Sequence, residues 1–464
     1  MSTPSPSTRP ASQLPIAVIG GGATGLAAAH RLAGAGKAVR LFEAGPGLGG
    51  AVGTTRLDGW LIESGPNSLQ ENTREVVDLI SELGLAAERV EANPASKKRF
   101  IVRGGRACAV PMSPAALART DLFSARSKLR LLTEPFSRRR RRTSDVSLAS
   151  FVRDHFGDEI VDYALNPVVS GIYAGDPNRL SARVAFPKLW ACEQTHGSLI
   201  RGQIAQARTR RAEGEPKSRI ISFRGGLQVL TDALAASLPR DSIECGVKIE
   251  SLLPGKPWRL VWSRAGETHT ETFSHILLAI PAPSLAQLSF GSLAERPLAC
   301  LEAVEYPPVM SLFLGYRRDQ VEHPLDGFGA LVPAAEKLNL LGVLFSSTLF
   351  PGRAPDGHVA LTVMVGGALR PDLARQSPDD VFGVVAPELG KLLGVRGDPV
   401  FRHHHFWPRA IPQYQLGYER HLEVMARAEK DLPGLLIGGN TRDGISLPNC
   451  LASGRRLAAQ VLGM

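Results

Sequence analysis

The chain has 464 residues, of which 44% are hydrophobic and 21% charged, so it is long enough for two or three domains and argues against widespread disorder. Its 54 Lys and Arg against 44 Asp and Glu give a net charge of +10. That excess favours anionic partners, without choosing among acidic small molecules, anionic lipid and nucleic acid.

The cysteines and the first residues bear on location. The five cysteines are scattered and none forms a C-x-x-C pair, which argues against a disulfide framework or a zinc or iron–sulfur site and favours a reducing cytoplasm. Residues 1–14 are predicted to be a disordered tail, because they are rich in Ser, Thr and Pro and lack the apolar core of a signal peptide. No apolar stretch reaches the roughly 18 residues of a membrane-spanning helix, so membrane contact is predicted to be peripheral.

Residues 15–92 are predicted to open a dinucleotide-binding domain. A β-branched run at 14–19 ends in three glycines, 26–33 has helix-forming composition, and 39–42 is a second strand-like run. Strand, glycine turn, helix and strand within about thirty residues make the βαβ unit of a doubly wound sheet. Apolar residues at helical spacing predict a further helix over 71–85.

Residues 93–217 are predicted to form a mostly helical insertion. Helical composition returns after Pro114, and the stretches 148–164 and 199–212 continue it. The five arginines at 138–142 interrupt the helices with a segment that does not fit a core.

The second half of the chain returns to the first domain twice, at 218–282 and at 425–464, with a substrate-binding domain at 283–424 between the two returns. Predicted strands lie at 243–253, 258–262, 276–280, 309–314, 338–345, 360–365 and 435–437, and predicted helices at 227–238 and from about 451. The predicted fold class is therefore α/β: a Rossmann-like doubly wound domain, an antiparallel-sheet substrate domain and a helical insertion.

The strongest motif is Gly20-x-Gly22-x-x-Gly25, followed by Glu43. Gly20 allows the tight turn, Gly22 lets a pyrophosphate approach bare backbone, and Gly25 lets the helix pack closely on the strand. The helix N-terminus then faces the phosphates, and an acid at the end of the second strand accepts hydrogen bonds from a ribose. Glycine turns also occur for packing alone, but strand, helix and acid together favour nucleotide binding.

A second motif favours FAD over NAD. Glu43 is followed by Gly49-Gly50 and then by the stretch Glu63-Ser64-Gly65-Pro66. A glycine pair shortly after the ribose acid is typical of flavoenzymes of the amine oxidase and desaturase type. Taken alone, the pair would more simply turn a loop.

Several stretches resemble the protoporphyrinogen oxidase family, in the same order along nearly the whole chain. They are 20–26 (GGGATGL), 62–68 (IESGPNS), 171–177 (GIYAGDP), 222–227 (SFRGGL), 411–414 (IPQY), 438–440 (GGN) and 447–450 (LPNC). The run 171–177 is the most specific of these within the broader flavoprotein class.

The resemblance implies an FAD-dependent oxidase that removes six electrons from protoporphyrinogen IX in three two-electron steps, with oxygen as final acceptor, in haem biosynthesis. Because the flavin carries the chemistry, no catalytic acid or base is expected. The implied FAD contacts are Gly20, Gly21, Gly22, Ala23, Thr24 and Gly25 at the phosphates, Glu43 and Ala44 at the ribose, Gly50, Gly65, Pro66, Asn67 and Ser68, Val247 near the adenine, Trp407 near the flavin, and Ile445, Ser446 and Leu447 along its ring.

Two positions depart from the family. A basic residue often stands two places before the glycine pair, where this chain has Gly47, and a lysine or similar residue often follows the pair, where it has Ala51. One phosphate contact is therefore lost or supplied from elsewhere.

Arg99 is the expected substrate contact. A porphyrinogen carries propionates, which favour a cation in the cleft, and Arg99 matches the family's arginine before a Phe and a short strand. Lys97 and Lys98 beside it fit a solvated edge better.

Two charged runs outside these motifs have simpler explanations. In 402–405 (RHHH) only His403 and His405 share a face of an extended segment, and no further ligand stands at metal spacing, so a strand leading to Trp407 is predicted. The arginines at 138–142 lack interleaved aromatics, which disfavours nucleic acid. They fit a solvated loop or, functionally, contact with an anionic membrane surface on the cytoplasmic side.

Three alternatives remain open on the sequence. The first is oxidation of coproporphyrinogen III to coproporphyrin III by the same mechanism, since the Pro-Asn-Cys tail also resembles that branch. The second is another flavin amine oxidase or desaturase. The third is a non-enzymatic protein of the Rab escort type, which the intact glycine loop disfavours. A homodimer is compatible with the sequence, which does not specify an oligomeric state.

Overall fold

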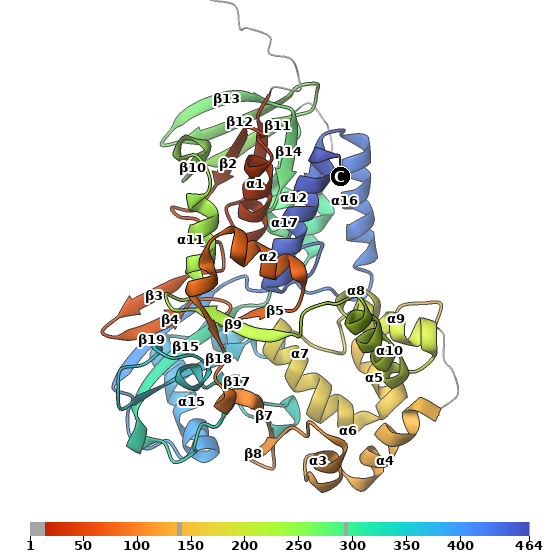
Figure 1. Cartoon of the computed structure of the whole chain (residues 1–464), viewed down its shortest axis with the longest axis vertical. Coiled ribbons are helices and arrows are strands. Elements are labelled where there is room, and N and C mark those ends of the chain that lie inside the picture. The colour runs from red at the N-terminus through yellow and green to blue at the C-terminus, as the bar shows by residue number, and fades with distance from the viewer. Residues whose placement is uncertain (1–13, 137–141, 292–295, 464) are drawn as a thin grey trace, which may run out of the picture.

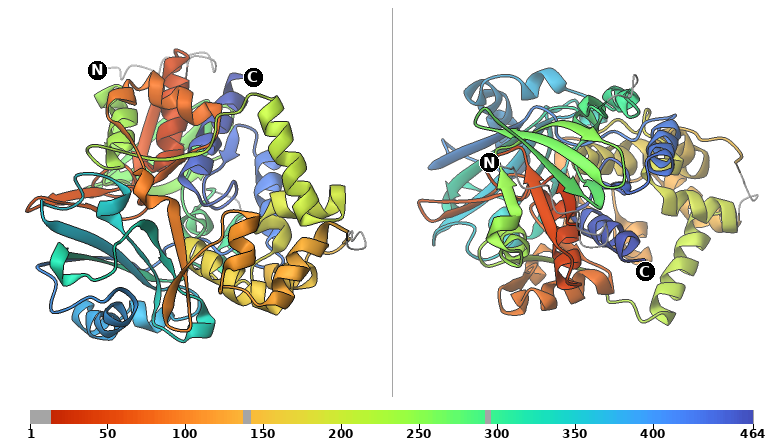
Figure 2. Two further views of the ribbon diagram at one scale, coloured as in Figure 1. Left: turned by 60° about the horizontal axis from the view of Figure 1, so that its bottom comes forward. Right: turned by 90° about the horizontal axis from the view of Figure 1, so that it is seen from above.

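The computed structural model describes residues 14–136, 142–291 and 296–463. Three regions can be followed in Figure 1: a parallel-sheet region at one end of the molecule, and a mixed sheet and a group of helices at the other. The further views in Figure 2 show the mixed sheet and the helices lying side by side beneath the parallel-sheet region. Residues 1–13 of the predicted tail lie outside the described ranges.

The parallel sheet has the strand order β10-β2-β1-β14-β20. Its strands are β1 (Ile16–Ile19), β2 (Val39–Glu43), β10 (Ile243–Cys245), β14 (His275–Leu278) and β20 (Leu435–Ile437), and all neighbours run parallel. In chain order this is 3-2-1-4-5, the order of a doubly wound dinucleotide-binding sheet. The order reverses between β1 and β14, and in such sheets a ligand lies beyond the carboxyl ends of the strands at that point.

The two faces of this sheet follow the alternation of strand side chains. Ile16 and Val18 face one apolar cluster, formed with the helices α1 (Ala23–Gly34), α2 (Arg74–Glu82), α11 (Gln228–Ala236) and α17 (Leu447–Leu462). Ala17 and Ile19 face a second cluster, which includes the antiparallel strands β11 (Lys248–Leu253), β12 (Trp258–Arg264) and β13 (Glu267–Phe273) and the helices α12 (Ala282–Gln287) and α16 (Glu419–Asp431). The sheet is thus covered on both sides, as its β-branched strands require.

The mixed sheet has seven strands in the order β19-β15-β18-β17-β16-β7-β8. They are β7 (Lys98–Arg103), β8 (Arg106–Ala109), β15 (Val309–Arg317), β16 (Gly327–Leu331), β17 (Leu340–Leu344), β18 (His358–Gly366) and β19 (Phe401–Trp407), and α15 (Pro378–Leu393) packs on one face. Strands β7 and β8 were expected within the helical insertion. They join the sheet because Phe100 and Val102 alternate onto its buried face.

The helical insertion follows β8. It contains α3 (Pro114–Arg119), α4 (Ala125–Thr133), α5 (Leu148–Phe156), α6 (Asp158–Ile160), the π-helical turn η5 (Val161–Leu165), α7 (Asn166–Tyr173), α8 (Ala182–Ala185), α9 (Pro187–His196) and α10 (Leu199–Ala212). The stretch 148–164 is helical, as its composition predicts, but it is divided at Gly157, whose φ of +88° ends α5. No helix in the described ranges is long and apolar enough to cross a membrane.

Short elements connect the regions. A hairpin of β3 (Thr54–Leu57) and β4 (Trp60–Glu63), and a small sheet of β5 (Leu69–Glu71), β6 (Arg89–Glu91) and β9 (Arg219–Phe223), link the parallel sheet to the mixed one, while α13 (Ser346–Leu349) and α14 (Pro371–Ala374) lie in the mixed-sheet region. The terminal helix α17 begins at Leu447, earlier than the predicted 451. Ser446 caps it by accepting a hydrogen bond from the Asn449 N–H, and Pro448 stands in the first turn, where proline is tolerated.

Candidate functional site

At two positions of the glycine loop between β1 and α1, neighbouring backbone lies too close for a side chain. A Cβ on Gly20 would lie 2.5 Å from the carbonyl oxygen of Ala279, just beyond β14, and the φ of Gly20 is +109°. A Cβ on Gly25 would lie 1.8 Å from the carbonyl oxygen of Gly20. Both glycines therefore allow close approach of backbone to backbone, as the motif predicts.

Gly22 is different, because its side-chain direction is open. The nearest atom that a Cβ would meet is the Cα of Gly50, at 3.9 Å. Gly22 also stands at the N-cap of α1, where no side chain caps the helix and the first turn, Ala23 to Leu26, carries no acid. An open space before an uncapped helix N-terminus fits an anionic pyrophosphate.

Glu43 ends β2 beside this loop. Its carboxylate accepts hydrogen bonds from the N–H of Gly21 at 2.6 Å and of Gly45 at 2.7 Å. A carboxylate offers about four acceptor positions, so these bonds orient Glu43 and leave capacity for ribose hydroxyls. Val247 lies next to it, its N–H donating to the carbonyl of Glu43 at 3.1 Å, and Ala44 is exposed.

The next two predicted FAD segments pack onto the glycine loop and onto each other. The N–H of Gly49 donates to the carbonyl of Gly21 at 2.8 Å, and a Cβ on Gly50 would lie 3.1 Å from the Cα of Gly22. A Cβ on Gly65 would lie 2.0 Å from the carbonyl oxygen of Ala51. The glycine pair is therefore part of the site's close packing rather than a separate loop turn.

The loop 64–68 is held by one internal hydrogen bond and by one from the mixed sheet. Within it, the amide of Asn67 donates to the carbonyl of Gly65 at 3.1 Å. From the mixed sheet, the indole N–H of Trp407 donates to the carbonyl of Ser64 at 2.8 Å. Trp407 thus lies where the mixed sheet meets the predicted cofactor loops.

Strand β19 carries the histidine run, and the strand prediction for it is confirmed. The ring of His405 lies 4.3 Å from that of Trp407, centroid to centroid. Burial lowers the pKa of both His403 and His405, so both favour the neutral form. Within the described ranges, no group of three or more His, Cys, Asp or Glu side chains is placed to hold a metal.

The C-terminal segment meets the glycine loop at Thr24. A Cβ on Gly454 of α17 would lie 2.2 Å from the carbonyl oxygen of Thr24, and a Cβ on Gly439 would lie 3.5 Å from its hydroxyl. The predicted ring contacts Ile445, Ser446 and Leu447 stand at the start of α17. Predicted cofactor residues from the two ends of the chain are therefore neighbours.

Arg99, the expected substrate contact, is exposed on β7. Its guanidinium lies 5.5 Å from the ring centroid of Phe328 on β16, and among the described residues it forms no ion pair. Arg103, on the same face of β7 by strand alternation, pairs with Glu159 of the helical insertion at 2.7 Å. Arg99 thus lies on the face of the mixed sheet that meets the helices.

The arginine run at 138–142 is only partly described, and for Arg142 the predicted solvated loop is wrong. Residues 138–141 lie outside the described ranges. Arg142 pairs with Asp154 at 2.7 Å and with Glu193 at 3.1 Å. Its charge is needed inside the protein, because the Glu193 side chain is fully buried.

One buried pair beside the site was missed by sequence reasoning. Glu63, at the end of β4, accepts hydrogen bonds from the Thr54 hydroxyl at 2.6 Å and the Leu227 N–H at 3.0 Å, and lies 3.4 Å from Arg353. Burial raises the pKa of Glu63 and lowers that of Arg353. Arg353 stands in a loop of the mixed-sheet region with no signal in the sequence around it.

This pair fixes the start of a predicted cofactor loop. Arg353 also donates to the Ser222 hydroxyl at 2.6 Å, and its carbonyl accepts from the Leu61 N–H at 3.4 Å. A cavity of about 10 Å³, with room for about one water molecule, lies between Glu63, Arg353 and Asn67. The loop 64–68 therefore begins from a rigid junction between the two sheets.

These features together fit FAD. An open, uncapped helix N-terminus lies at the switch point of a doubly wound sheet, an oriented carboxylate ends the second strand, and glycine segments from three parts of the chain converge there. A long dinucleotide that runs from Val247 to the start of α17 would pass along all of them.

Comparison with known proteins agrees. Residues 23–462 match the family described as flavin containing amine oxidoreductase. The chain is 34% identical to protoporphyrinogen oxidase 2 of Arabidopsis thaliana, over 96% of this chain and 93% of that one. It is 26% identical to coproporphyrinogen III oxidase of Bacillus subtilis, over 96% and 97%.

Solved structures extend the likeness to the whole fold. A crystal structure from Exiguobacterium sp. 255-15, assigned as a protoporphyrinogen oxidase, superposes with a TM-score of 0.80 at 26% identity, covering 98% of this chain and all of that one. The chain belongs to the flavin-containing amine oxidoreductase family and is an FAD-dependent oxidoreductase.

Proposed function

We propose that the chain is a protoporphyrinogen oxidase, which converts protoporphyrinogen IX to protoporphyrin IX with oxygen as final acceptor. The observation that carries this proposal is 34% identity to a protoporphyrinogen oxidase over 96% of the chain. Its place would be in haem biosynthesis.

We assign the FAD contacts along the line of the converging segments. Residues 20–25 would bind the pyrophosphate, Glu43 and Ala44 the ribose, and Val247 the adenine side. Gly50 and the loop 65–68 would follow the dinucleotide toward Trp407, and 445–447 would lie along the ring. The support is geometric: the open side of Gly22, the oriented carboxylate of Glu43 and the contact of Trp407 with Ser64.

When bound, FAD supplies the two-electron acceptor for each of three successive oxidations. The chain's own residues then bind and orient the porphyrinogen. Arg99 would hold a propionate through charge-assisted hydrogen bonds, since its guanidinium is exposed and unpaired within the described ranges. His403 and His405 favour the neutral form because of burial, and so would add no competing positive charge near Trp407.

Coproporphyrinogen III oxidation is the second candidate. The observation in its favour is the likeness to the Bacillus subtilis coproporphyrinogen III oxidase over 96% of the chain. Both substrates carry propionates and both would use the same cofactor, so the fold does not choose between them. The higher identity to the Arabidopsis enzyme places protoporphyrinogen first.

The test is a side-by-side assay of the purified, FAD-loaded chain. The rate at which porphyrin fluorescence increases should rise with the oxygen concentration and with the enzyme concentration. The value of kcat/KM should be higher for protoporphyrinogen IX than for coproporphyrinogen III. The reverse ratio would assign the second function. No oxidation of either, by protein with a normal flavin spectrum, would refute both.

We further propose that the helical insertion contacts an anionic membrane surface on the cytoplasmic side. Leu129, Leu132 and Phe136 are exposed, Phe136 by 88%. The exposed Arg126 stands three residues before Leu129, and the arginines at 138–141 follow Phe136 after one serine. Apolar side chains beside cations are what an anionic lipid surface attracts.

Liposome co-sedimentation tests the membrane proposal. Changing Leu129, Leu132 and Phe136 to Ser, or 138–141 to Ser, should reduce binding to anionic vesicles at low salt, and added salt should weaken the parent's binding. Leu57→Ser, at an exposed leucine of the β3–β4 hairpin, is the matched control. Unchanged sedimentation of both insertion variants would refute the proposal.

A further inference from the structure

Three tyrosine hydroxyls hold the loop that precedes α17, residues 438–446, which we call the flavin-side loop. Tyr418 donates to the carbonyl of Thr441 at 2.7 Å, and Tyr306 lies 3.2 Å from the Thr441 hydroxyl. Tyr414 donates to the carbonyl of Asn440 and accepts from the N–H of Gly444 at 3.0 Å. None of the three tyrosines belongs to the loop, and all come from segments before α16.

Tyr414 makes the tightest of these attachments, because its one hydroxyl bonds two backbone groups four residues apart in the loop. Its side chain is buried, at 3% exposure. Burial raises the pKa of Tyr414 well above its ordinary value, so the hydroxyl keeps its proton and remains a donor to Asn440. The pair of bonds sets the path of the backbone into Ile445.

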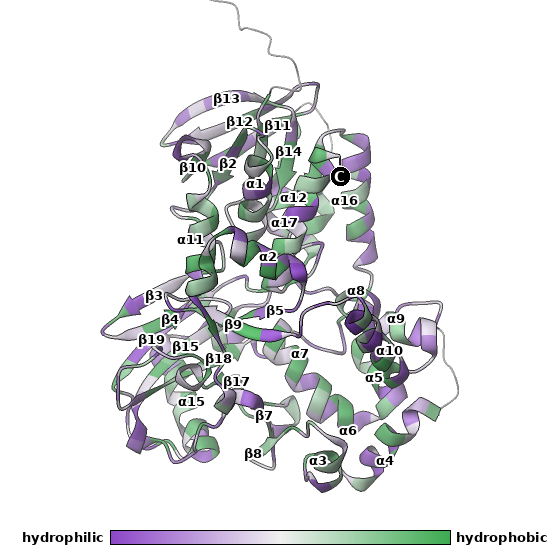
Figure 3. Cartoon of the chain, viewed as in Figure 1, coloured by the Kyte–Doolittle hydropathy of each residue, from purple (hydrophilic) through white to green (hydrophobic). Residues whose placement is uncertain are grey.

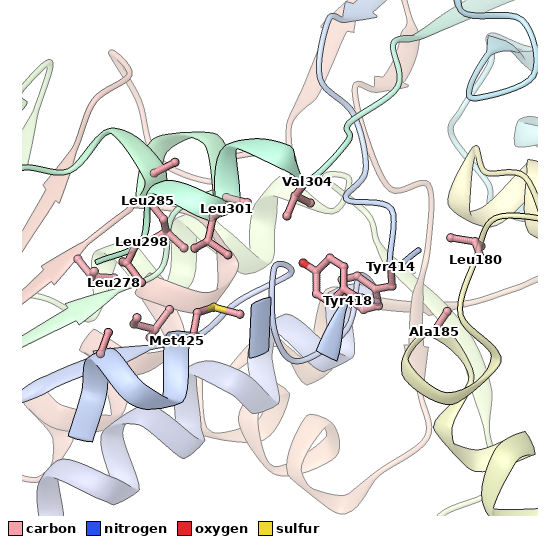
Figure 4. Packing of buried hydrophobic residues seen from close by; sticks show 14 of the residues in the cluster. Leu180, Ala185, Leu278, Leu285, Leu298, Leu301, Val304, Tyr414, Tyr418 and Met425 are labelled. Carbon is pink, nitrogen blue, oxygen red and sulfur yellow. The ribbon is translucent and has the colours of Figure 1, made fainter. Parts of the chain in front are cut away.

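Tyr414 also reaches the helical insertion. Its backbone carbonyl accepts a hydrogen bond from the N–H of Ser181 at 2.8 Å, and Leu180 and Ala185 belong to the same apolar cluster as its ring. Figure 4 shows Tyr414 and Tyr418 together between Val304 on one side and Leu180 and Ala185 on the other. The ring centroids of the two tyrosines lie 4.6 Å apart.

We infer that Tyr414 is a positioning residue for the flavin: its hydroxyl fixes the backbone at Asn440 and Gly444, and so sets where Ile445 meets the isoalloxazine ring. This rests on the proposed contact of 445–447 with the flavin. Through its backbone bond to Ser181, the same residue ties the position of the helical insertion to that of the flavin-side loop.

Tyr414→Phe is the direct test, because it removes one oxygen and keeps the ring. Two partly buried backbone groups, the carbonyl of Asn440 and the N–H of Gly444, then lose their partner. We expect the dissociation constant for FAD to rise about ten- to a hundredfold, and the visible circular dichroism and reduction potential of the bound flavin to differ from the parent's. Tyr418→Phe, which frees the carbonyl of Thr441, should act in the same direction but less, and serves if Tyr414→Phe does not fold.

Tyr173→Phe is the matched control. The Tyr173 hydroxyl donates to the carbonyl of Ala185 at 3.0 Å inside the helical insertion, so its loss should lower stability without changing the flavin signals. If both Tyr414→Phe and Tyr418→Phe bind FAD as the parent does, and the circular dichroism and reduction potential of the bound flavin are unchanged, the inference is overturned.

These measurements need no porphyrinogen. A chain that binds FAD but oxidises no porphyrinogen would refute the proposed function and leave the role of Tyr414 testable. A chain that oxidises porphyrinogen normally, but whose FAD binding and flavin signals are unchanged by Tyr414→Phe, would support the proposed function and refute the role of Tyr414.

Discussion

The parallel-sheet region and the helical insertion are each stabilised in a different way. In the parallel-sheet region, glycines bring backbone against backbone: Gly25 packs on the carbonyl of Gly20, and Gly454 on that of Thr24. Figure 3 shows hydrophobic residues along its inner strands and helices, whereas α9 and α10 of the insertion carry many hydrophilic ones. The stability of the parallel-sheet region is therefore expected to depend on close packing and apolar burial.

The helical insertion instead has charged groups in its interior. His155 lies between two fully buried carboxylates, 2.9 Å from Glu134 and 2.8 Å from Glu193. Glu134 also accepts hydrogen bonds from the Ser198 hydroxyl and the Leu199 N–H. Glu134, His155 and Glu193 come from η4 (Glu134–Phe136), α5 and α9 respectively.

The difference has a physical consequence. Backbone contacts at glycine tolerate no added atom but do not respond to pH, whereas a buried charge network tolerates small changes in shape but depends on protonation. Substitutions and changes of pH should therefore affect the stability of the two regions differently.

The largest effect is expected for Gly25→Ala in the parallel-sheet region. The new Cβ would stand 1.8 Å from the Gly20 carbonyl oxygen, and neither backbone segment can move without opening the sheet. We expect a loss of unfolding free energy on the order of 5 kcal/mol, measured by urea denaturation, or a failure to fold.

Two glycines in the same helix region provide controls. Gly34→Ala meets no atom within 4 Å and should be neutral or slightly stabilising. Gly22→Val should fold normally, since its side points to open space, but should bind no FAD. A Gly25→Ala protein as stable as Gly34→Ala would contradict the backbone-contact explanation.

The next largest effect is expected for His155→Leu in the insertion. Removing the imidazole leaves the buried Glu134 and Glu193 without their shared partner, and breaking such a network costs about 3 to 5 kcal/mol. Limited proteolysis should show cleavage within 114–212 before the parallel-sheet region. His30→Ala, on α1, is the control, because His30 is partly exposed and should cost far less.

A pH dependence should follow from Glu134. Burial alone would raise its pKa, but hydrogen bonds from His155, Ser198 and the N–H groups of Leu199 and Ile200 outweigh it and lower the pKa to about 2. Because the folded pKa lies below the unfolded value of 4.5, the stabilisation is present above pH 4.5 and is lost as the pH falls toward 2. Its upper bound is roughly 3 kcal/mol.

The measurement is the proteolysis rate of the insertion between pH 5 and about 3, compared with Glu134→Gln. The variant should be less stable than the parent at pH 5 and should respond less to acid. If the proteolysis rates of the two proteins change with pH in the same way, Glu134 is not the cause of the acid sensitivity.

The smallest effect is expected for Arg99→Ala, on the face of the mixed sheet that meets the insertion. Loss of a charge-assisted contact worth roughly 1.5 to 3 kcal/mol should raise KM for porphyrinogen about ten- to a hundredfold, with kcat and the flavin spectrum little changed. Lys at this position should recover part of the affinity.

Lys98→Ala is the control, since Lys98 is exposed and pairs with Asp326, and its KM should stay near the parent's. An unchanged KM for Arg99→Ala would remove Arg99 from the substrate site. A large fall in kcat at constant KM would mean that Arg99 acts in the chemistry or the structure and not in substrate binding.

The sequence alone determined the parts of the protein that depend on neighbours in the chain. The glycine spacing from Gly20 to Gly25, the acid Glu43 at a strand end and the fold class all follow from local conformational limits, which are readable within about thirty residues. The helix at 199–212 followed from composition, and the strand through the histidine run toward Trp407, which the structure places at 401–407, followed from the lack of further ligands at metal spacing.

Only the tertiary structure decided which distant residues meet. It placed the β7–β8 hairpin in the mixed sheet, paired Arg142 with the buried Glu193, set Arg353 against Glu63, and brought the Tyr414 hydroxyl to Asn440 and Gly444. The hairpin is placed by the burial of Phe100 and Val102. The polar contacts join residues at least 26 positions apart, and burial selects them too: a charge or hydroxyl removed from water takes the nearest complementary group, whatever its position in the chain.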